Sequence, residues 1–372
     1  MIQNRAKRIL FLTLEMDFGG LQRVVNQIVR RMDRKRFEPF LCCLDRGGVF
    51  SDDLQDLGIK PYVLERRPGP FDARLFLRLL RILNQQKIDV IHSQNGCSSY
   101  AALAGRLARI KGIVHTDHGR LVPDKKSAML EDRFSSCLID RYVAVSEELA
   151  SYLAGEMGVS RRKLTTILNG VDSDRFKPAC KDEKGSIKTQ LGFEEQDRII
   201  GTVCRLDPIK NLEFMINSMP LILKDVPSAR LLIVGDGPSR RKLEETAVDA
   251  GVAKDVVFTG NRDDVEKVMP AFDLYACTSL SEGTSMTILE AMACGLPIVA
   301  SAVGGNRSLV EKGIGALFPP GDVEAFVKAA TGLLLDSEAS AACSAGSRER
   351  VLASYTVDRM VERYEALYES LC

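Results

Sequence analysis

Two carboxylates eight positions apart mark the stretch SEGTSMTILEAMACG, residues 281–295. Glu282 stands just before an apolar, helix-forming run, and Glu290 stands inside it. A charged side chain is rarely buried without a partner, and the neighbouring sequence supplies no cation. The partner could be a ligand, because vicinal hydroxyl groups pair well with carboxylates. Spacing alone leaves open the alternative that Glu282 is a solvated loop residue and Glu290 a capped carboxylate of the core.

The same stretch predicts a helix whose N-terminus could bind an anion. The helix should begin near Thr284 or Ser285, which are good N-cap residues, and end at Gly295. Free backbone N–H groups in its first turn, at 286–288, favour a phosphate. A nucleotide sugar has hydroxyl groups on both sides of a diphosphate and would suit both carboxylates. The donor-binding residues predicted in this stretch are Gly283, Thr284, Ser285, Met286, Thr287, Ile288 and Glu290.

Two cations follow a predicted strand in GTVCRLDPIKN, residues 201–211. Arg205 offers a planar fork of hydrogen-bond donors and Lys210 a point charge, and both suit a diphosphate. We therefore place them in the catalytic centre with Glu282. The alternative is that both are ordinary surface cations.

Two motifs in the first half add candidates at the ends of predicted strands. In DFGGLQR, residues 17–23, Gly19 and Gly20 would let the backbone approach a phosphate closely, although such a pair is usually only a turn. In VHTDHGR, residues 114–120, His118 stands where a side chain would face a cleft, and it joins the catalytic candidates. A lone histidine is more often structural, so that alternative stays open.

Several observations argue against other kinds of protein. VGDGPSR, residues 234–240, has Arg240 where a dinucleotide fingerprint needs its third glycine. Asp172 and Asp174 favour a turn over a metal site, and no His/Cys cluster has metal-ligand spacing, so we expect neither a metal nor another cofactor. Ten cysteines without a CxxC pair, no apolar run of about 18 residues and no signal peptide predict a reduced, cytoplasmic protein. No nucleic-acid partner is expected.

Short apolar runs alternate with helical patterns along the 372 residues. Continuous apolar strands predict parallel sheets that helices cover on both faces. The predicted strands are residues 8–14, 37–44, 61–65, 89–93, 112–116, 141–146, 164–168, 198–204, 229–235, 256–259, 273–278, 297–301 and 315–318. The fold class is therefore α/β, with two doubly wound Rossmann-like domains facing a central cleft. Their ligand should lie in that cleft, at the carboxyl ends of the strands.

The domain boundaries follow from a change in composition. Residues 1–175 and 197–354 form the two predicted domains, and the polar segment 176–196, which lacks a clear apolar period, is a predicted linker. Residues 355–372 form a final amphipathic helix. The residues on its apolar face are Val357, Met360, Val361, Tyr364, Leu367 and Tyr368.

Charge is distributed unevenly, although the net charge is only +1. Residues 1–180 hold 30 Lys and Arg against 21 Asp and Glu, whereas residues 181–372 hold 21 against 29. The first half should therefore meet something anionic.

Taken together, these motifs resemble those of the retaining GT-B glycosyltransferases of family 4, also called the group 1 glycosyltransferases. The strongest match is the E-x7-E pair of Glu282 and Glu290, which continues as LEAMACGLPIVASAVGGN. Other similar segments are GGLQR, NGVDSDRF, CRLDPIKN, LLIVGDGP, VVFTGNRDD and LFPPGD. The resemblance covers nearly the whole chain. It implies a metal-independent transfer of a hexose from a UDP- or GDP-sugar, with retention of the anomeric configuration.

The resemblance also implies a role for each candidate residue. Glu282 would bind hydroxyl groups of the transferred sugar, and Glu290 those of the ribose. Arg205 and Lys210 would neutralise the diphosphate leaving group. Gly20 would approach that diphosphate from the N-terminal domain.

Further implied roles concern the edges of the site. His118 would lie near the sugar, and the loop at 260–262, with Arg262, would lie against the base. The final helix would cross back to the N-terminal domain. The sequence departs from the common pattern at Thr284 and Ser285, which are polar where the family often has apolar residues or glycine, and at Ser308, where the family often has an acid.

The sequence thus predicts a glycosyltransferase that acts on a glycan or lipid-linked acceptor, in bacterial cell-surface polysaccharide biosynthesis. A nucleotide-sugar epimerase and a non-catalytic sugar-nucleotide-binding protein are the alternatives.

An anionic membrane surface is a further predicted partner. A basic cluster at 30–36, the pair at 66–67 and a basic amphipathic helix at 72–86 predict peripheral docking on the inner face of the cell membrane. The alternative is that this helix covers the sheet and exposes its arginines to water.

Overall fold

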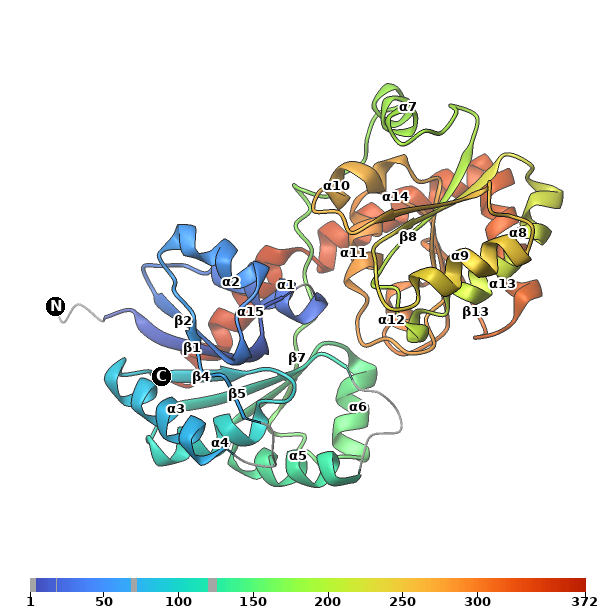
Figure 1. Cartoon of the computed structure of the whole chain (residues 1–372). Helices are drawn as coiled ribbons and strands as arrows, with labels where there is room; N and C mark the ends of the chain where they lie inside the picture. The colour runs from blue at the N-terminus through green and yellow to red at the C-terminus, as the bar shows by residue number, and fades with distance from the viewer. Residues whose placement is uncertain (1–4, 18, 68–71, 120–125) are drawn as a thin grey trace. The chain divides into compact units, whose positions relative to one another are not determined.

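The computed structural model describes residues 5–17, 19–67, 72–119 and 126–372. They form two compact units: one is built on the residues up to Gly170 together with Val357–Cys372, and the other is Val171–Thr356. Phe18 of the DFGGLQR motif and Arg120 of VHTDHGR lie outside the described residues. Figure 1 shows a sheet with helices on both faces in each unit.

The first unit contains a seven-stranded sheet with the order β3-β2-β1-β4-β5-β6-β7, and its neighbouring strands are parallel. The order reverses between β1 and β4, which is where doubly wound sheets bind ligands. Its strands are β1 (Lys7–Glu15), β2 (Phe37–Arg46), β3 (Tyr62–Val63), β4 (Val90–Ser93), β5 (Gly112–Asp117), β6 (Arg141–Ala144) and β7 (Leu164–Thr166).

Seven α-helices and one 3-10 helix are described in this unit. They are α1 (Gly20–Arg31), α2 (Val49–Asp53), η1 (Leu54–Leu57), α3 (Ala73–Gln85), α4 (Ser98–Leu107), α5 (Lys126–Leu138), α6 (Glu147–Gly155) and α15 (Val357–Glu369). Helices α3, α4 and α5 lie side by side on one face of the sheet (Figure 1). Leu75, Leu79 and Leu83 of α3 belong to the hydrophobic core beneath them. The stripe that these three leucines form is therefore covered by the sheet and is not available to a bilayer.

Helix α15 packs against α1 with its predicted apolar face, which is buried. A buried polar chain also holds it. Tyr368 Oη lies 2.7 Å from His92 Nδ1, and His92 Nε2 lies 2.7 Å from Thr116 Oγ1, which is 3.2 Å from Tyr364 Oη. Burial keeps the pKa of His92 well below its usual value. The histidine is therefore neutral, and the last helix belongs to the first unit although the second unit precedes it in the chain.

The second unit contains a six-stranded sheet with the order β10-β9-β8-β11-β12-β13, also parallel between neighbours. Its strands are β8 (Arg198–Val203), β9 (Ala229–Val234), β10 (Val256–Gly260), β11 (Leu274–Cys277), β12 (Ile298–Ser301) and β13 (Gly315–Phe318). Every predicted strand is thus present in the two sheets. The α/β fold class with two doubly wound sheets is confirmed.

Helices cover both faces of this second sheet as well (Figure 1). They are α7 (Lys181–Gln190), α8 (Leu212–Asp225), α9 (Arg240–Asp249), α10 (Val265–Val268), α11 (Met286–Ala293), α12 (Asn306–Leu309), α13 (Val323–Leu335) and α14 (Ser337–Ser354), with the 3-10 helices η2 (Pro208–Lys210) and η3 (Met269–Ala271).

The segment 176–196, predicted to be a linker, instead contains helix α7 and belongs to the second unit. Lys184 and Lys188 each place Nζ 2.9 Å from a carboxylate oxygen of Asp273. Burial opposes ionisation of Asp273, but the two lysines outweigh it and lower the pKa of this carboxyl group. The helix is anchored by ion pairs rather than by an apolar stripe, so the sequence pattern did not reveal it.

Candidate active site

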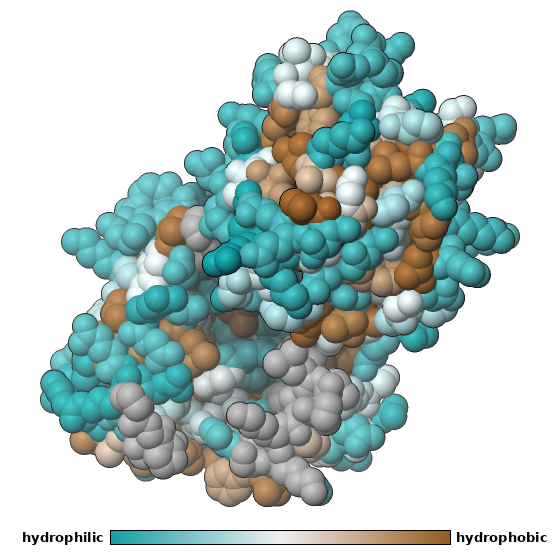
Figure 2. Space-filling model, turned by 45° about the vertical axis from the view of Figure 1, so that its right-hand side comes forward, coloured by the Kyte–Doolittle hydropathy of each residue, from teal (hydrophilic) through white to brown (hydrophobic). Residues whose placement is uncertain are grey.

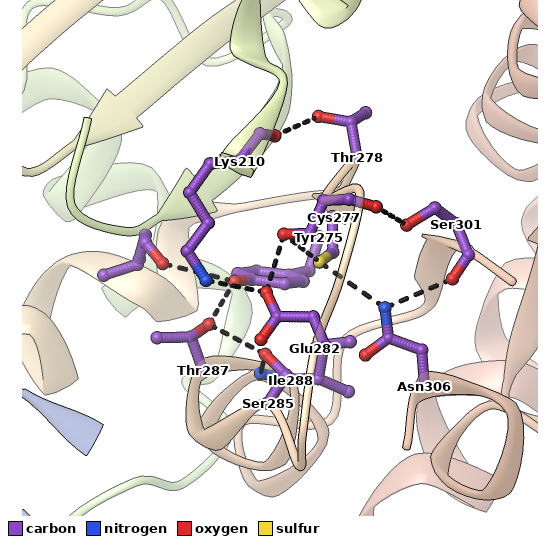
Figure 3. A network of polar contacts seen from close by, with 12 residues as sticks. Lys210, Tyr275, Cys277, Thr278, Glu282, Ser285, Thr287, Ile288, Ser301 and Asn306 are labelled. Carbon is purple, nitrogen blue, oxygen red and sulfur yellow. Dashed lines mark hydrogen bonds and ion pairs between the residues drawn. The ribbon is translucent and has the colours of Figure 1, made fainter. Parts of the chain in front are cut away.

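A lysine and a carboxylate meet at the carboxyl ends of β8 and β11. Lys210 ends η2, Glu282 lies in the loop after β11, and Nζ is 2.7 Å from Oε1 (Figure 3). Their side chains are 26% and 11% exposed. Burial would lower the pKa of Lys210, but the Glu282 carboxylate raises it above its usual value. Lys210, predicted to bind the diphosphate, and Glu282, predicted to bind the sugar, thus form a charged, part-buried pair within the second unit.

Hydroxyl groups tie the loops around this pair together. Ser279 Oγ donates to Glu282 Oε1 at 2.6 Å, the same oxygen that Lys210 contacts. Thr278 Oγ1 donates to the carbonyl of Lys210 at 3.0 Å. The loops that follow β8 and β11 are therefore fixed to each other beside the ion pair. Sequence reasoning did not single out Ser279, because its contact with Glu282 forms only when the loop between them folds into a turn.

Helix α11 begins where predicted, with Ser285 as its N-cap in an extended conformation. Ser285 Oγ accepts a hydrogen bond from the Ile288 backbone N–H at 3.4 Å. The expectation that Ile288 offers a free N–H to a phosphate is therefore wrong, since a side chain already caps it. Tyr275 Oη donates to Thr287 Oγ1 at 2.7 Å and holds the first turn of the helix on β11. The side chains of Met286 and Ile288 are buried, so they could offer a ligand only their backbone.

Two glycines allow the acidic loop to pack closely. Gly305 N donates to the Gly283 carbonyl at 2.9 Å, and a Cβ atom on Gly305 would lie 2.0 Å from that oxygen. At Gly304, which has a φ of +42°, a Cβ atom would lie 1.8 Å from the Glu282 carbonyl. No side chain fits either position. The GG pair of VASAVGGN thus supports the loop that carries Glu282, Gly283 and Thr284.

Glu290 lies inside α11 and is only 1% exposed, as its apolar neighbours predicted. Burial, and then the Glu290 charge, raise the pKa of the Cys294 thiol one turn further on. The sequence therefore located a buried carboxylate correctly, and its role stays a prediction.

The two predicted arginines differ in their surroundings. Arg205 follows β8 and is 71% exposed, with Nε 3.2 Å from Asp207. Arg262 follows β10, at the edge of the sheet, and makes two hydrogen bonds of 2.8 Å to the Asp264 carboxylate. That carboxylate fixes the orientation of the Arg262 guanidinium, whereas Arg205 has room to move toward an anion.

In the first unit, Gly19 and Gly20 follow β1 and open α1, as predicted. Gly19 is the extended N-cap residue, and its carbonyl accepts from Arg23 N at 3.0 Å. A third glycine, Gly48, shapes this loop. With a φ of +156°, its Cβ atom would lie 2.6 Å from Asp17 N. Gly48 of DRGGVF therefore packs on the loop before Gly19, a support that sequence reasoning missed.

His118 follows β5, and two side chains at the end of β4 hold it. Its Nε2 lies 2.7 Å from Gln94 Oε1, and its backbone N–H donates to Asn95 Oδ1 at 2.8 Å. Burial, with a smaller effect of His115, lowers the pKa of His118 to about 3. The imidazole is therefore neutral at physiological pH, so it can exchange hydrogen bonds with a ligand but cannot supply positive charge.

The turn predicted at Asp172 and Asp174 is confirmed. Asp172 Oδ1 accepts from the backbone N–H of Asp174 at 3.2 Å and of Arg175 at 3.1 Å. Among the described residues, no three His, Cys, Asp or Glu side chains gather in an arrangement that could hold a metal ion.

Three of the four arginines in the predicted membrane-binding cluster at 30–36 pair with acids of the first unit. Arg30 pairs with Asp53 and Asp56, Arg31 with Asp358, and Arg36 with Glu365 and Glu369. Arg66 pairs with Asp45, and Arg78 of α3 donates to the Leu64 carbonyl at 2.7 Å. The cluster at 30–36 therefore serves largely to hold α15 and η1 on the unit. Within the described part of the chain, no helix combines the length and apolar character needed to cross a bilayer.

Two family models match the chain. The model described as "Glycosyltransferase Family 4" matches residues 18–175, and the model described as "Glycosyl transferases group 1" matches residues 197–336. They match separate halves, and the second covers the whole of the Lys210–Glu282 constellation.

Curated relatives are similar over most of their length. The chain is 26% identical over 364 residues to the UDP-Gal:alpha-D-GlcNAc-diphosphoundecaprenol alpha-1,3-galactosyltransferase of Escherichia coli, covering 94% of this chain and 93% of the relative. It is 30% identical over 295 residues, with 74% and 75% covered, to the GDP-mannose-dependent alpha-(1-6)-phosphatidylinositol monomannoside mannosyltransferase of Mycolicibacterium smegmatis.

A solved structure shares the fold. The crystal structure of Anabaena HepE in complex with UDP superposes with a TM-score of 0.87, at 22% identity, over 98% of this chain and all of the other. Like this chain, the structural neighbours have the GT-B architecture of two doubly wound domains.

Proposed function

Because the chain belongs to the group 1 glycosyltransferases, we propose that it transfers a hexose from a nucleotide diphosphate sugar to a glycan or lipid-linked acceptor, with retention of configuration and without a metal. The observation that carries the proposal is the Lys210–Glu282 pair at the carboxyl ends of β8 and β11, next to the N-terminus of α11. This pair supports the proposal because a lysine, which suits a diphosphate, and a carboxylate, which suits sugar hydroxyls, are joined by one hydrogen bond.

In this proposal the leaving group receives most of the catalytic assistance. Lys210 and Arg205 neutralise the charge that develops on the diphosphate as the sugar becomes oxocarbenium-like, which is preorganised electrostatic stabilisation. The departing phosphate takes the proton of the acceptor hydroxyl, so no side chain has to form a covalent bond to the sugar. Gly20 approaches the diphosphate with its backbone, and Arg262 lies against the base.

The carboxylates and the histidine orient the donor. Lys210 and Ser279 both contact Oε1 of Glu282, so Oε2 is the oxygen that accepts a hydrogen bond from a sugar hydroxyl. His118 meets the sugar as a neutral hydrogen-bonding group, since the pKa of its ring is lowered to about 3. Glu290 binds the ribose from within α11. Orientation of this kind removes entropy from the reacting complex before the reaction begins.

A nucleotide-sugar screen tests the proposal. The wild-type protein is heated with UDP-glucose, UDP-galactose, UDP-N-acetylglucosamine or GDP-mannose, because a ligand that binds only the folded state raises the melting temperature. The nucleotide sugar that raises the melting temperature most is then incubated with the protein in the absence of an acceptor. We expect slow hydrolysis with retained configuration. Epimerised sugar would indicate an epimerase, and binding without any turnover would indicate a non-catalytic protein.

Changing Glu290 to glutamine should weaken donor binding more than it slows the bound reaction. The ribose changes little between ground state and transition state, so its contacts contribute equally to both. Donor KM should rise while kcat is largely retained. A large loss of kcat at unchanged KM would place Glu290 at the reacting sugar instead.

Chelation should leave the activity intact. Lys210 and Arg205 supply the positive charge that a divalent ion would otherwise bring to the diphosphate. Initial rates measured after dialysis against EDTA should equal those of untreated enzyme. A loss that Mg²⁺ or Mn²⁺ restores would overturn metal independence.

The acceptor proposal draws on the relatives. The Escherichia coli relative is named for a diphosphoundecaprenol-linked acceptor and the mycobacterial one for a phosphatidylinositol mannoside. With a lipid-linked acceptor, this protein would act in cell-surface polysaccharide synthesis, at the cytoplasmic face of the membrane.

The surface proposed to meet the membrane lies on the α3, α4 and α5 layer. Leu77 of α3, Leu107 of α4, and Leu130 and Phe134 of α5 are each more than 60% exposed. On α3, the exposed Arg74 and Arg81 flank Leu77 at helical spacing. Figure 2 shows hydrophobic residues at several places on a surface that is mostly hydrophilic. Exposed apolar side chains beside arginines that have no ion-pair partner among the described residues suit an anionic lipid surface better than the paired cluster at 30–36 does.

Vesicle co-sedimentation should show binding to vesicles that contain phosphatidylglycerol, and salt should weaken it because the charges are screened. A variant with Arg74 and Arg81 changed to serine and Phe134 to serine should remain in the supernatant. The control changes Arg30 to serine, since that arginine is paired with Asp53 and Asp56. If the wild-type protein does not sediment even at low salt, peripheral docking is ruled out and a soluble acceptor is favoured.

A further inference from the structure

We propose that Ser279 and Ser301 form a hydroxyl relay that holds Glu282 in the orientation in which it meets the transferred sugar. Both are positioning residues, because they act through Glu282 rather than on the donor. The inference rests on the proposed role of Glu282 and extends it to Ser279, which lies outside the quoted motifs, and to Ser301, to which they assign no role.

The hydrogen bonds of the relay have a defined direction. Ser301, the last residue of β12, donates its hydroxyl proton to the Ser279 carbonyl at 2.6 Å. Ser279 donates its own hydroxyl proton to Glu282 Oε1 at 2.6 Å. A carboxylate and a carbonyl can only accept, so each serine must be the donor. Both serines are at most 1% exposed, which keeps water from competing for these bonds.

Asn306 anchors the other end of the relay. Its side chain is fully buried, and Nδ2 donates to the Ser301 carbonyl at 3.2 Å and points toward Cys277 Sγ at 3.8 Å. Figure 3 shows the resulting chain, which runs from Asn306 through Ser301 and the β11 end to Glu282 and Lys210. The loop that carries Glu282 is thus held from β12 as well as from β8.

The relay matters most once a donor is bound. In the ligand-free protein, Lys210 and Ser279 share Glu282 Oε1. A diphosphate that attracts Lys210 would weaken its hold on the carboxylate. Ser279 is then the contact that keeps Oε1 in place and leaves Oε2 for the sugar. Hydrogen bonds to a charged acceptor are short and strong, so a single hydroxyl can do this.

The experiment compares Ser279→Ala, Ser279→Thr and Ser301→Ala with Ser218→Ala. Ser218 is a matched control, because it is equally buried in the same unit and donates to the Phe214 carbonyl at 2.8 Å within α8. Donor hydrolysis is measured with whichever of UDP-glucose, UDP-galactose, UDP-N-acetylglucosamine or GDP-mannose the wild-type protein turns over. Dissociation constants of UDP and GDP are measured by calorimetry, and melting temperatures report the fold.

We expect Ser279→Ala to lower kcat/KM by about 10- to 100-fold, because small misplacements of an orienting group are costly. Ser301→Ala should lower kcat/KM by a smaller factor. Ser279→Thr should retain most of the wild-type kcat/KM, because threonine keeps the hydroxyl that Ser279→Ala removes. Affinity for UDP or GDP alone should be unchanged, since the relay orients the sugar contact and not the diphosphate contacts. Ser218→Ala should behave as wild type.

Two results would overturn the relay while leaving the proposed function intact. One is wild-type kcat/KM in Ser279→Ala alongside a large loss in Glu282→Gln. The other is an equal loss of UDP or GDP affinity and donor turnover, which would indicate general disruption of the site. A wild-type protein that binds neither nucleotide nor hydrolyses any donor would instead overturn the proposed function, and the relay with it.

Discussion

Lys210→Ala should reduce turnover by about 10²-fold or more, the usual cost of removing one preorganised group that stabilises developing charge. Lys210 lies at the carboxyl end of β8, and the only ion-pair partner found for it among the described residues is Glu282, at 2.7 Å. The substitution therefore removes the cation for the diphosphate and also alters the carboxylate proposed for the sugar. Steady-state kinetics with the donor from the nucleotide-sugar screen provide the measurement.

The same substitution should also lower the melting temperature. It would leave the Glu282 carboxylate, which is only 11% exposed, without its cation, and an uncompensated charge in such a place is destabilising. A Lys210→Met, Glu282→Gln double variant separates the two effects, since it should regain stability but not turnover. Turnover near the wild-type level in a folded Lys210→Ala protein would show that Lys210 does not assist the leaving group.

Arg205→Ala should reduce turnover to a similar degree, by about 10²-fold, but leave stability unchanged. Its side chain is 71% exposed and lies 3.2 Å from Asp207, and exposed ion pairs contribute little to stability. Kinetics and thermal melting of the same preparation test both halves of the prediction.

Arg198→Ala is the matched control for Arg205. Arg198 begins β8, so it lies at the opposite end of the strand that precedes Arg205, and its side chain is 53% exposed. This variant should retain wild-type turnover. Equal losses in the two variants would mean that the effect is a general one of positive charge in this unit and would contradict a specific role for Arg205.

Much of the fold was accessible from the sequence because local patterns determine it. Continuous apolar runs predicted every strand of both sheets, since buried parallel strands must be apolar on both faces. Ser285 marked the start of α11 through its capping oxygen, and the apolar neighbours of Glu290 predicted its burial correctly. The final helix was predicted from its amphipathic face, which is buried on the first unit.

The predictions that were wrong for whole segments share a cause. In each case the residue that pairs with the predicted segment is distant from it in the sequence. Helix α7 has no apolar stripe, and its Lys184 and Lys188 pair with Asp273, which lies more than 80 residues further along the chain. The basic cluster at 30–36 suggested a free charged surface, but Arg31 and Arg36 pair with acids of α15 more than 300 residues further on. A count of charged residues describes composition only. Whether a basic side chain can bind a membrane depends on whether the fold places an acidic side chain beside it.

The sequence by itself determined the family, the two doubly wound sheets and the residue types available at the ends of their strands, because apolar periodicity, caps and glycines act over a few residues. Only the tertiary structure decided that Lys210 and Glu282, 72 positions apart, form one ion pair. It also brought Ser301 and Ser279, 22 positions apart, into the same network. Parallel strands that are neighbours in the sheet end at the same edge, so the topology of the sheet, rather than spacing in the chain, brings these side chains together.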